Sequence, residues 1–401
     1  MTDEGRRPQR IPNWWDEEDS TDKPASRSEE DIMADIQPIT MPKWGLAMEE
    51  GMLARWTVDV GAAIELGQEI MDIETTKIAN VFESPVAGVL RRRVVDDGDT
   101  VPVGALLGVV AGPDVTDEAV DDFVNAFLEN FTPEESGEAG GPVPETVEAG
   151  GRRIRRLKAG SESGEPIVFI HGFGADLSTW MLNQAPLAEE RPVHAIDLPG
   201  HGGSGKEVGD GSVEVLARAV LAYMDAEGLD TAHLVGHSLG AAIAATIALE
   251  APDRVSGLTL VAPAGLGPEI SGDFIAGFIK ESRARKLRPY LEMLVADPDL
   301  VTADMVEDVL KFKRLDGALA ALQAIAAANF DENTQRVSLR DRLGGIGVPV
   351  HVVWGEADRV LPASHAEGLP DNVTVTVIPG AGHIVHMEKA GEVNKVITGA
   401  S

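Results

Sequence analysis

The sequence predicts two folded units of different class: a small all-β flattened barrel, then a larger α/β domain with a mostly parallel sheet and a helical cap. Two observations carry this prediction. Glycines repeat with a constant offset of 37 residues, which indicates two similar β-halves: Gly51, Gly61 and Gly67 recur as Gly88, Gly98 and Gly104. Farther along the chain, short apolar strands alternate with helical patterns, as is typical of a mostly parallel sheet.

Composition narrows the function classes. The chain of 401 residues has 66 acidic and 34 basic residues, a formal net charge of −32, and no cysteine. This balance argues against nucleic acid or an anionic membrane as a partner. The lack of cysteine excludes disulfides, thiolate metal sites and cysteine nucleophiles, and we expect no metal site. There is no apolar run of membrane-spanning length, so we expect a cytoplasmic protein.

Residues 1–34 are polar and poor in apolar side chains, which predicts a disordered extension. The β unit is expected at 35–112. Its two halves meet at Ile73-Glu74-Thr75-Thr76-Lys77-Ile78, so Lys77 is expected at an exposed hairpin tip. The unit resembles a lipoyl domain, through this tip and the early Met41-Pro42-Lys43-Trp44-Gly45. The resemblance implies covalent lipoate on Lys77. Biotin is the alternative, but biotinyl domains usually have methionine on both sides of the lysine.

A linker is predicted at 113–147. It lies in a stretch, residues 114–150, with eleven acidic residues and no basic one, so like-charge repulsion should extend it. One amphipathic helix interrupts it, with Thr116 as its expected N-cap and apolar residues at helical spacing: Val120, Phe123, Val124, Phe127, Leu128 and Phe131. Its apolar face is expected either to dock a partner subunit or to pack on the chain's own catalytic domain.

The α/β unit is expected at 148–401. A short apolar strand leads into Gly236-His237-Ser238-Leu239-Gly240, and a small-residue helix follows. A G-x-S-x-G turn between strand and helix exposes the serine hydroxyl above the sheet, so Ser238 is the predicted nucleophile. The whole region resembles the α/β-hydrolase fold, with a helical cap at about 264–344.

In that family, the acid and then the base follow the serine along the chain. Asp358 follows the predicted strand at 348–354, and His383 follows the last strand, so these two residues match the family's positions. Glu356 is the rival acid and His386 the rival base. The expected oxyanion donors are two backbone N–H groups. One belongs to Leu239, which begins the helix after the G-x-S-x-G turn, and the other to Phe173, which follows His171-Gly172.

A lipoyl domain joined to an α/β-hydrolase domain resembles the dihydrolipoyl acetyltransferases of acetoin-cleaving dehydrogenase complexes. The resemblance implies acetyl transfer from lipoyl-Lys77 to coenzyme A. It also implies a thiamine-diphosphate-dependent dehydrogenase component and dihydrolipoamide dehydrogenase as partners, and a homo-oligomer. Two alternatives stay open: a lipoyl-bearing thioesterase or esterase that releases the acyl group to water, and a carrier scaffold whose hydrolase-like domain only binds.

One basic cluster stands out in this acidic chain. Five cations fall within nine residues of the predicted cap: Lys280, Arg283, Arg285, Lys286 and Arg288. Such a cluster attracts anions, so it is a candidate site for the phosphates of coenzyme A. The alternative is a solvated helix paired with local acids such as Glu281.

Overall fold

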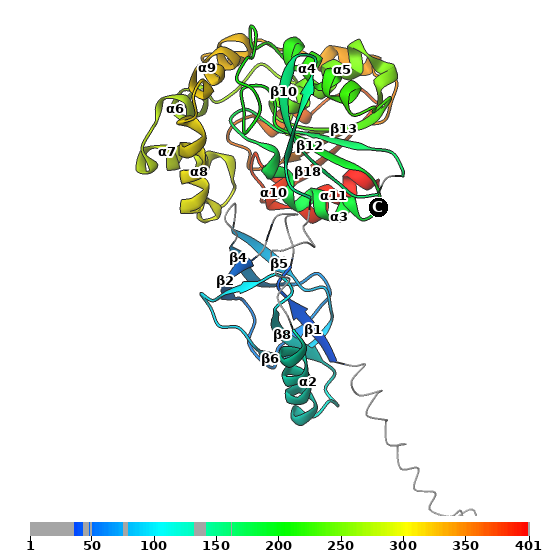
Figure 1. The fold of residues 1–401 in the computed structure, drawn as a ribbon, viewed down its shortest axis with the longest axis vertical. Coiled ribbons are helices and arrows are strands. Elements are labelled where there is room, and N and C mark those ends of the chain that lie inside the picture. The colour runs from blue at the N-terminus through cyan, green and yellow to red at the C-terminus, as the bar shows by residue number, and fades with distance from the viewer. Residues whose placement is uncertain are drawn as a thin grey trace, which may run out of the picture.

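The computed structural model describes residues 36–42, 48, 50–74, 79–131, 142–161 and 163–399. Lys77 and the extension predicted to be disordered, residues 1–34, lie outside the described residues. The chain builds a small β unit and a larger α/β unit, which confirms the predicted fold class (Figure 1). Among the described residues, no helix combines the length and the apolar character needed to cross a lipid bilayer.

The small unit consists of two four-stranded sheets, ordered β1-β8-β6-β3 and β5-β4-β2-β7. Its strands are β1 (Ile36–Thr40), β2 (Glu50–Trp56), β3 (Ala63–Ile64), β4 (Glu69–Glu74), β5 (Ala79–Glu83), β6 (Gly88–Arg93), β7 (Thr100–Pro102) and β8 (Leu106–Ala111). The repeat relates β2 to β6, β3 to β7 and β4 to β8, so the orders β8-β6-β3 and β4-β2-β7 correspond. The repeated sequence therefore forms two matching sheets around one apolar core.

The repeated glycines have a conformational reason. Gly67 and Gly104 occupy equivalent turns and have φ angles of 78° and 81°. Residues with a Cβ atom rarely adopt this left-handed conformation, so the turn that precedes each matching strand needs glycine.

The linker helix α2 (Asp117–Asn130) packs on the small unit, an arrangement that the sequence analysis did not consider. Thr116 caps it by accepting a hydrogen bond from the Ala119 amide at 3.2 Å. Its apolar face shares a core with β8, where Val120 is fully buried. Arg91 lies 2.9 Å from the Asp117 carboxylate. The helix thus extends the β unit.

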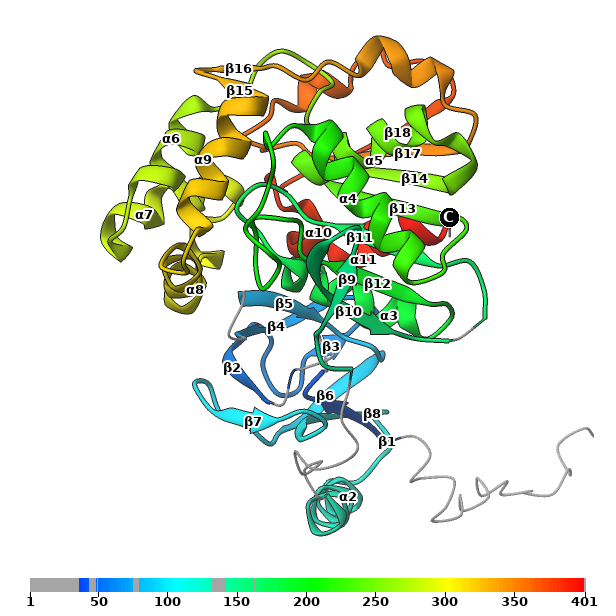
Figure 2. The same cartoon turned by 45° about the horizontal axis from the view of Figure 1, so that its top comes forward.

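The α/β unit is built on an eight-stranded sheet with the order β18-β17-β14-β13-β11-β12-β10-β9 (Figure 2). Its strands are β9 (Glu145–Ala149), β10 (Arg152–Ala159), β11 (Ile167–Ile170), β12 (Val193–Ile196), β13 (Ala232–His237), β14 (Val255–Val261), β17 (Val350–Gly355) and β18 (Val373–Ile378). The six strands from β18 to β12 are parallel, whereas β10 and β9 are antiparallel. Because β13 is central, the turn that follows it lies between loops from both neighbouring strands.

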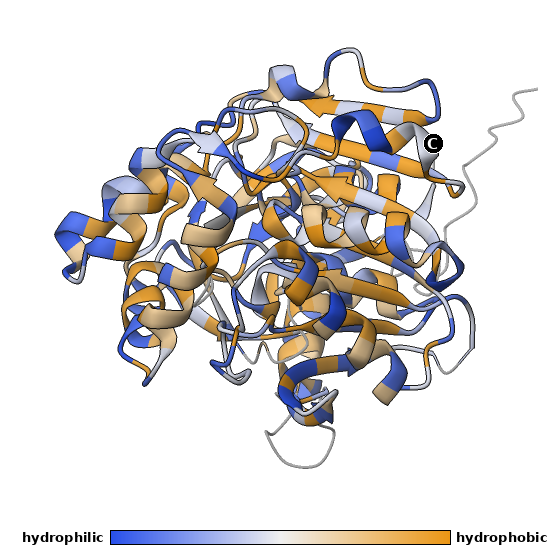
Figure 3. Cartoon of the chain, turned by 90° about the horizontal axis from the view of Figure 1, so that it is seen from above, coloured by the Kyte–Doolittle hydropathy of each residue, from blue (hydrophilic) through white to orange (hydrophobic). Residues whose placement is uncertain are grey.

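Helices cover both faces of this sheet. They are α3 (Met181–Ala188), α4 (Val213–Ala226), α5 (Leu239–Glu250), α10 (Val385–Glu388) and α11 (Ala390–Thr398), with the short 3-10 turns η1 (Leu177–Trp180), η2 (Pro252–Arg254), η5 (Arg340–Gly345) and η6 (Ala363–Ala366). Along β11, Val168 and Ile170 join the core under α4 and α5, whereas Ile167 and Phe169 join the core under α3 and α11. Both faces are buried, and the central strands are accordingly apolar (Figure 3).

The cap is inserted between β14 and β17. It contains α6 (Gly272–Lys280), α7 (Ala284–Leu291), η3 (Glu292–Leu294), η4 (Pro298–Leu300), α8 (Ala303–Lys313), α9 (Ala318–Asn329) and the hairpin β15 (Phe330–Asp331) and β16 (Thr334–Gln335). Strand β5 of the small unit contacts η4 of the cap. Figure 2 shows β5 on the side of the small unit that faces the α/β unit.

Candidate active site

Ser238 occupies a strained turn between β13 and α5. Its φ and ψ angles are 52° and −114°, a conformation that a residue with a side chain rarely adopts. Two backbone hydrogen bonds fix the turn: the Ser238 amide donates to the Val261 carbonyl at 2.9 Å, and the Ala264 amide donates to the Ser238 carbonyl at 3.1 Å. Strain of this kind costs about 1–3 kcal/mol and persists only where the surroundings enforce it.

The two glycines of the turn are required by close backbone contacts. A Cβ atom on Gly236 would lie 2.4 Å from the Gly240 carbonyl oxygen, and one on Gly240 would lie 2.2 Å from the Ile170 carbonyl oxygen. Both gaps are far shorter than any real contact. The G-x-S-x-G spacing therefore has a steric basis here, since α5 starts directly against β11 and β13.

Asp358 and His383 come from the loops that follow β17 and β18. The carboxylate Oδ2 atom lies 2.8 Å from the imidazole Nδ1 atom, and both side chains are buried. The indole N–H of Trp354 also donates to Oδ2, at 3.0 Å. The Oδ1 atom accepts from the amides of Val360 and Leu361, at 2.8 and 2.9 Å. With Nδ1–H donating to the carboxylate, the Nε2 atom of His383 has its lone pair available as a base.

The rival acid and the rival base are placed differently. Glu356 is exposed. His386 is fully buried, and its ring packs in a tilted orientation against Trp180 and His237 at centroid distances of 4.3 and 4.5 Å. Among the described residues, neither ring nitrogen of His386 has a hydrogen-bond partner. Burial lowers the pKa of His386 to about 3, so this ring stays neutral. The geometry favours Asp358 and His383 as the pair.

The loop with Phe173 is pressed against the serine turn. A Cβ atom on Gly172 would lie 2.8 Å from His237 Nδ1 and 3.1 Å from Ser238 Cβ. On the other side, the amides of Ala241 and Ala242 donate to the Ser238 carbonyl. Leu239 precedes them at the start of α5, where backbone N–H groups lack intrahelical partners and the helix dipole attracts negative charge. Both expected oxyanion donors thus belong to segments that border Ser238.

Two buried histidines that the sequence analysis did not single out hold this loop. The Nε2 atom of His171 accepts from the Leu198 amide at 2.9 Å, while its Nδ1–H donates to the Gly172 carbonyl at 2.8 Å. The Nε2 atom of His201 accepts from the Gly174 amide at 3.1 Å. Burial lowers the pKa of both imidazoles, which keeps them neutral and able to accept. Their only signal in the sequence is their position beside glycine in loops after strands.

The Asp197 carboxylate also bonds to the loop that contains Phe173 and continues to Leu177. Its Oδ1 atom accepts from the Leu177 amide at 2.8 Å, and its Oδ2 atom accepts from the Gly203 amide at 2.7 Å. Arg155 lies 3.2 Å from this carboxylate. Burial raises the pKa of Asp197, and the hydrogen bonds to its ionised form oppose that rise. The carboxylate thereby joins the loop after β11 to the loop after β12.

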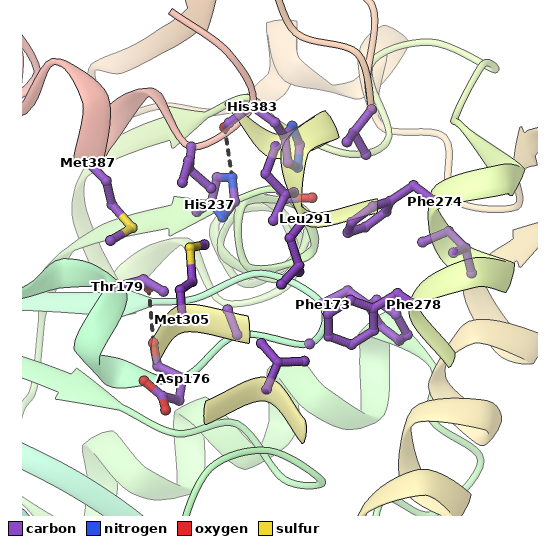
Figure 4. A pocket seen from close by; sticks show the side chains of 18 of the residues that line it. Phe173, Asp176, Thr179, His237, Phe274, Phe278, Leu291, Met305, His383 and Met387 are labelled. Atoms are coloured by element: carbon purple, nitrogen blue, oxygen red, sulfur yellow. Dashed lines mark hydrogen bonds between the residues drawn. The ribbon is translucent and has the colours of Figure 1, made fainter. Parts of the chain in front are cut away.

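Ser238 and His383 line one cavity with Phe173 (Figure 4). Its wall is mainly apolar, and nearly half of the lining residues come from the cap. Phe173, Phe274 and Phe278 gather on one side, and Asp176 and Thr179 lie on another. The apolar residues that the cap contributes are Ile270, Phe274, Ile275, Phe278, Leu291, Leu294, Met305, Val309, Phe312 and Phe330. The nucleophile candidate therefore faces a space whose wall is mainly apolar but also carries Asp176, Ser178, Thr179 and Asp308.

The basic cluster lies outside this cavity. None of its five side chains lines the cavity wall, and four of them are exposed, with Arg288 half-buried. Arg288 lies 3.5 Å from the Glu292 carboxylate. The cluster spans the end of α6 and most of α7, whose last residue, Leu291, does line the cavity.

The predicted lipoyl attachment site belongs to the connection between β4 and β5. Glu74 at the end of β4 pairs with Ala79 at the start of β5, so these strands form an antiparallel pair. Lys77 itself falls outside the described ranges.

Comparison with known proteins agrees with this architecture. A family model described as "alpha/beta hydrolase fold" matches residues 165–390, and one described as "Biotin-requiring enzyme" matches residues 37–110. The dihydrolipoyllysine-residue acetyltransferase component of the acetoin cleaving system of Pseudomonas putida is 45% identical over 364 residues, which are 90% of this chain and 98% of that protein. The protein of the same name from Cupriavidus necator is 42% identical over 367 residues, covering 92% and 98%.

The chain belongs to this acetyltransferase family. This chain thus joins a biotin/lipoyl-type domain to an α/β-hydrolase-fold domain in one polypeptide. The meta-cleavage product hydrolase of Pseudomonas fluorescens shares the second fold: it has a TM-score of 0.58 and 22% identity, covering 64% of this chain and 96% of that one. The α/β unit of this chain therefore has the α/β-hydrolase fold.

Proposed function

We propose that this chain transfers an acetyl group from dihydrolipoyl-Lys77 to coenzyme A through an acyl-enzyme on Ser238. The observation that carries the proposal is the bond between Asp358 and His383, beside a cavity that His383 shares with Ser238. A serine in this setting has the imidazole of His383 as its base, and the Asp358 carboxylate orients that imidazole. Acyl transfer by a serine needs both features.

In the first step, Nε2 of His383 accepts the proton of the Ser238 hydroxyl while Oγ attacks the thioester carbonyl. His383 would then give this proton to the sulfur of the lipoyl arm as the carbon–sulfur bond breaks. In the second step, His383 accepts the proton of the coenzyme A thiol, whose sulfur attacks the acetyl carbon. The ester bond to Ser238 breaks, and the proton returns to Oγ. Asp358 keeps the imidazole in one tautomer and stabilises it when protonated.

Each step places negative charge on the acetyl oxygen. We assign its two donors to the backbone N–H groups of Leu239 and Phe173. Each such donor contributes about 3 kcal/mol of transition-state stabilisation. The neutral side chains of His171 and His201 hold the second donor's loop, so they support the oxyanion site indirectly.

The apolar cavity favours transfer over hydrolysis. Water competes with the thiol for the acyl-enzyme, and a wall of cap side chains such as Phe274 and Leu294 offers water few hydrogen bonds. The second candidate function is a lipoyl-bearing thioesterase or esterase that releases acetate. Its support is that the hydrolase of Pseudomonas fluorescens has the same fold.

The cofactor and the partners follow from the family. We assign lipoate to Lys77 in preference to biotin, because the relatives are named for lipoyllysine. The apolar cavity suits the hydrocarbon part of such an arm, and β5 lies beside the cap. The relatives belong to acetoin cleaving systems, so the proposed partners are a thiamine-diphosphate-dependent dehydrogenase component and dihydrolipoamide dehydrogenase around a homo-oligomer of this chain.

For the acceptor, we propose that the basic cluster binds the phosphates of coenzyme A. Four of its five cations face solvent on a strongly acidic protein, where they form a local site of opposite charge. Helix α7 carries most of the cluster and ends at Leu291 on the cavity wall, so the cluster and the cavity lie along one helix.

A single-turnover experiment on the full chain tests the proposal. The lipoylated protein is acetylated on its arm, and product is followed with and without coenzyme A. We expect acetyl-coenzyme A when the acceptor is present and little free acetate when it is absent. Rapid acetate release regardless of coenzyme A would instead assign the thioesterase function. The chain with Lys77→Arg, which has no attachment site, is the matched control.

A further inference from the structure

A half-buried carboxylate joins the loop of the proposed base to the cap. Glu388 ends helix α10, five residues after His383. Its Oε1 atom accepts from the Gly382 amide at 2.7 Å, and its Oε2 atom accepts from the Ala296 amide at 2.8 Å. One side chain therefore fastens two segments that are more than eighty residues apart in the sequence.

The cap segment that Glu388 bonds to is residues 292–296, which we call the strap. The Ile384 amide donates to the Leu294 carbonyl at 3.0 Å. Contact at the strap is close, because a Cβ atom on Gly382 would lie 2.6 Å from the Val295 carbonyl carbon. Thus the residues immediately before and after His383 both approach or bond to the strap.

The loop of the proposed acid is tied to the same strap. The Arg359 guanidinium, next to Asp358, donates to the carbonyls of Val295, at 2.8 Å, and of Glu292. The strap in turn borders the cavity through Leu294, and Ile384 and Met387 line the same wall. The strap therefore contacts the loop of Asp358 and the loop of His383, and it also forms part of the cavity wall.

We propose that Glu388 is a positioning residue that sets the place of His383 relative to the cavity by holding its loop on the strap. This inference rests on the proposed function, which assigns His383 as the base. The role needs a carboxylate of this length. Both oxygens accept from amides, whereas a glutamine would turn an NH₂ group toward one of the two N–H donors. An aspartate is one methylene shorter, so it cannot span both amides.

The surroundings of Glu388 fit such a role. Burial raises its pKa, the amides of Ala296 and Gly382 lower it, and the nearby charge of Asp358 raises it. Partial removal of a carboxylate from water is costly unless its oxygens accept hydrogen bonds, and here both oxygens do. The two amide bonds thus keep it in place beside the Asp358–His383 pair.

The test compares Glu388→Gln and Glu388→Asp with Glu392→Gln, a control that neutralises an exposed acid one turn later, in α11. Two rates are measured below the melting temperature of each variant: acetyl transfer, and labelling of Ser238 by a fluorophosphonate probe. Labelling depends on activation of Ser238 and needs neither lipoate nor coenzyme A. Its result therefore stands even if the acetyl-transfer proposal fails.

We expect both Glu388 variants to lose about 10- to 100-fold in kcat and in the labelling rate, since a small displacement of a catalytic group has effects of this size. KM for coenzyme A should change little in either Glu388 variant. The labelling rate of Glu392→Gln should stay near that of the unmodified chain. Full labelling by either Glu388 variant would overturn the proposal. Failure of both variants to fold would assign Glu388 to stability instead and would also overturn it.

Discussion

The carboxylate of Asp358 bonds to Nδ1 of His383 at 2.8 Å while three other donors hold it in place. Two of them are amides of its own loop, and the third is the indole N–H of Trp354 at the end of β17. Asp358 therefore has little freedom to rotate, and the imidazole takes its orientation from the sheet. The role of Asp358 in orienting His383 can therefore be tested by changing one atom of its carboxylate.

Replacing Asp358 with asparagine keeps the shape and changes the hydrogen-bond pattern. In one orientation the NH₂ group would donate to Nδ1 of His383 and leave the Trp354 N–H without its acceptor, so the favoured tautomer of His383 would change. In the other orientation it would face the amide donors of Val360 and Leu361. We expect kcat for acetyl transfer to fall about 10⁴-fold, with little change in KM for coenzyme A. Steady-state kinetics check this. Glu356→Gln, at the exposed rival acid, is the matched control, and an equal loss there would contradict the assignment.

The serine turn should tolerate no side chain at Gly240. With a Cβ atom only 2.2 Å from the Ile170 carbonyl oxygen, Gly240→Ala must displace either β11 or α5. We expect a loss of more than about 3 kcal/mol in the free energy of unfolding, which lowers the melting temperature by roughly 6–12 °C. Thermal denaturation measures this. Gly391→Ala, where nothing lies within 4 Å of the new Cβ atom, should leave the melting temperature unchanged or raise it slightly.

His386 should make the protein less stable in acid. Burial lowers its pKa from 6.5 to about 3 in the folded state. Between these values the unfolded chain binds more protons than the folded one, so stability falls as the pH falls. His386→Phe removes this loss, which amounts to about 2 kcal/mol at about pH 5 and almost nothing above about pH 7.

Melting temperatures across this range check the prediction. The difference between His386→Phe and the unmodified chain should grow as the pH is lowered. A constant difference would show that His386 does not titrate on unfolding. Retained acetyl transfer in the variant would further separate His386 from the base.

The basic cluster should affect the acceptor alone. Replacing Arg283, Arg285 and Lys286 together with glutamine should raise KM for coenzyme A about tenfold at low salt, since these exposed side chains would no longer attract its phosphates. KM for a short thiol acceptor without phosphates should not change. Lys395→Gln, an exposed cation on α11, is the control. An equal rise in KM for both acceptors would argue against a phosphate site.

Patterns that lie along the chain could be predicted from the sequence, and contacts across the fold could not. The repeat predicted the β unit because equivalent turns need glycine, as at Gly67 and Gly104. Ser238, Asp358 and His383 could be named as candidates because each follows a strand of the predicted parallel sheet, and the structure places all three after β13, β17 and β18. The amphipathic pattern around Val120 indicates that one face is buried, but not that β8 covers it.

The supporting side chains were missed for a related reason. His171 and Asp197 act by accepting hydrogen bonds from amides of loops distant in the sequence. Glu388 likewise bonds to Ala296 across a long separation. Nothing in the local pattern of such residues differs from that of ordinary loop or helix positions, so only the folded arrangement shows what they hold.

The most direct test of the account is to look for the acetyl group on Ser238. The lipoylated chain is acetylated on its arm without coenzyme A, quenched in acid and digested, and the peptide with Ser238 is examined by mass spectrometry. We predict an acetyl adduct on Ser238 that disappears when coenzyme A is added before the quench, and that does not form in His383→Ala. Rapid formation of acetyl-coenzyme A by Ser238→Ala, at the rate of the unmodified chain and with no adduct in either protein, would contradict the central claim.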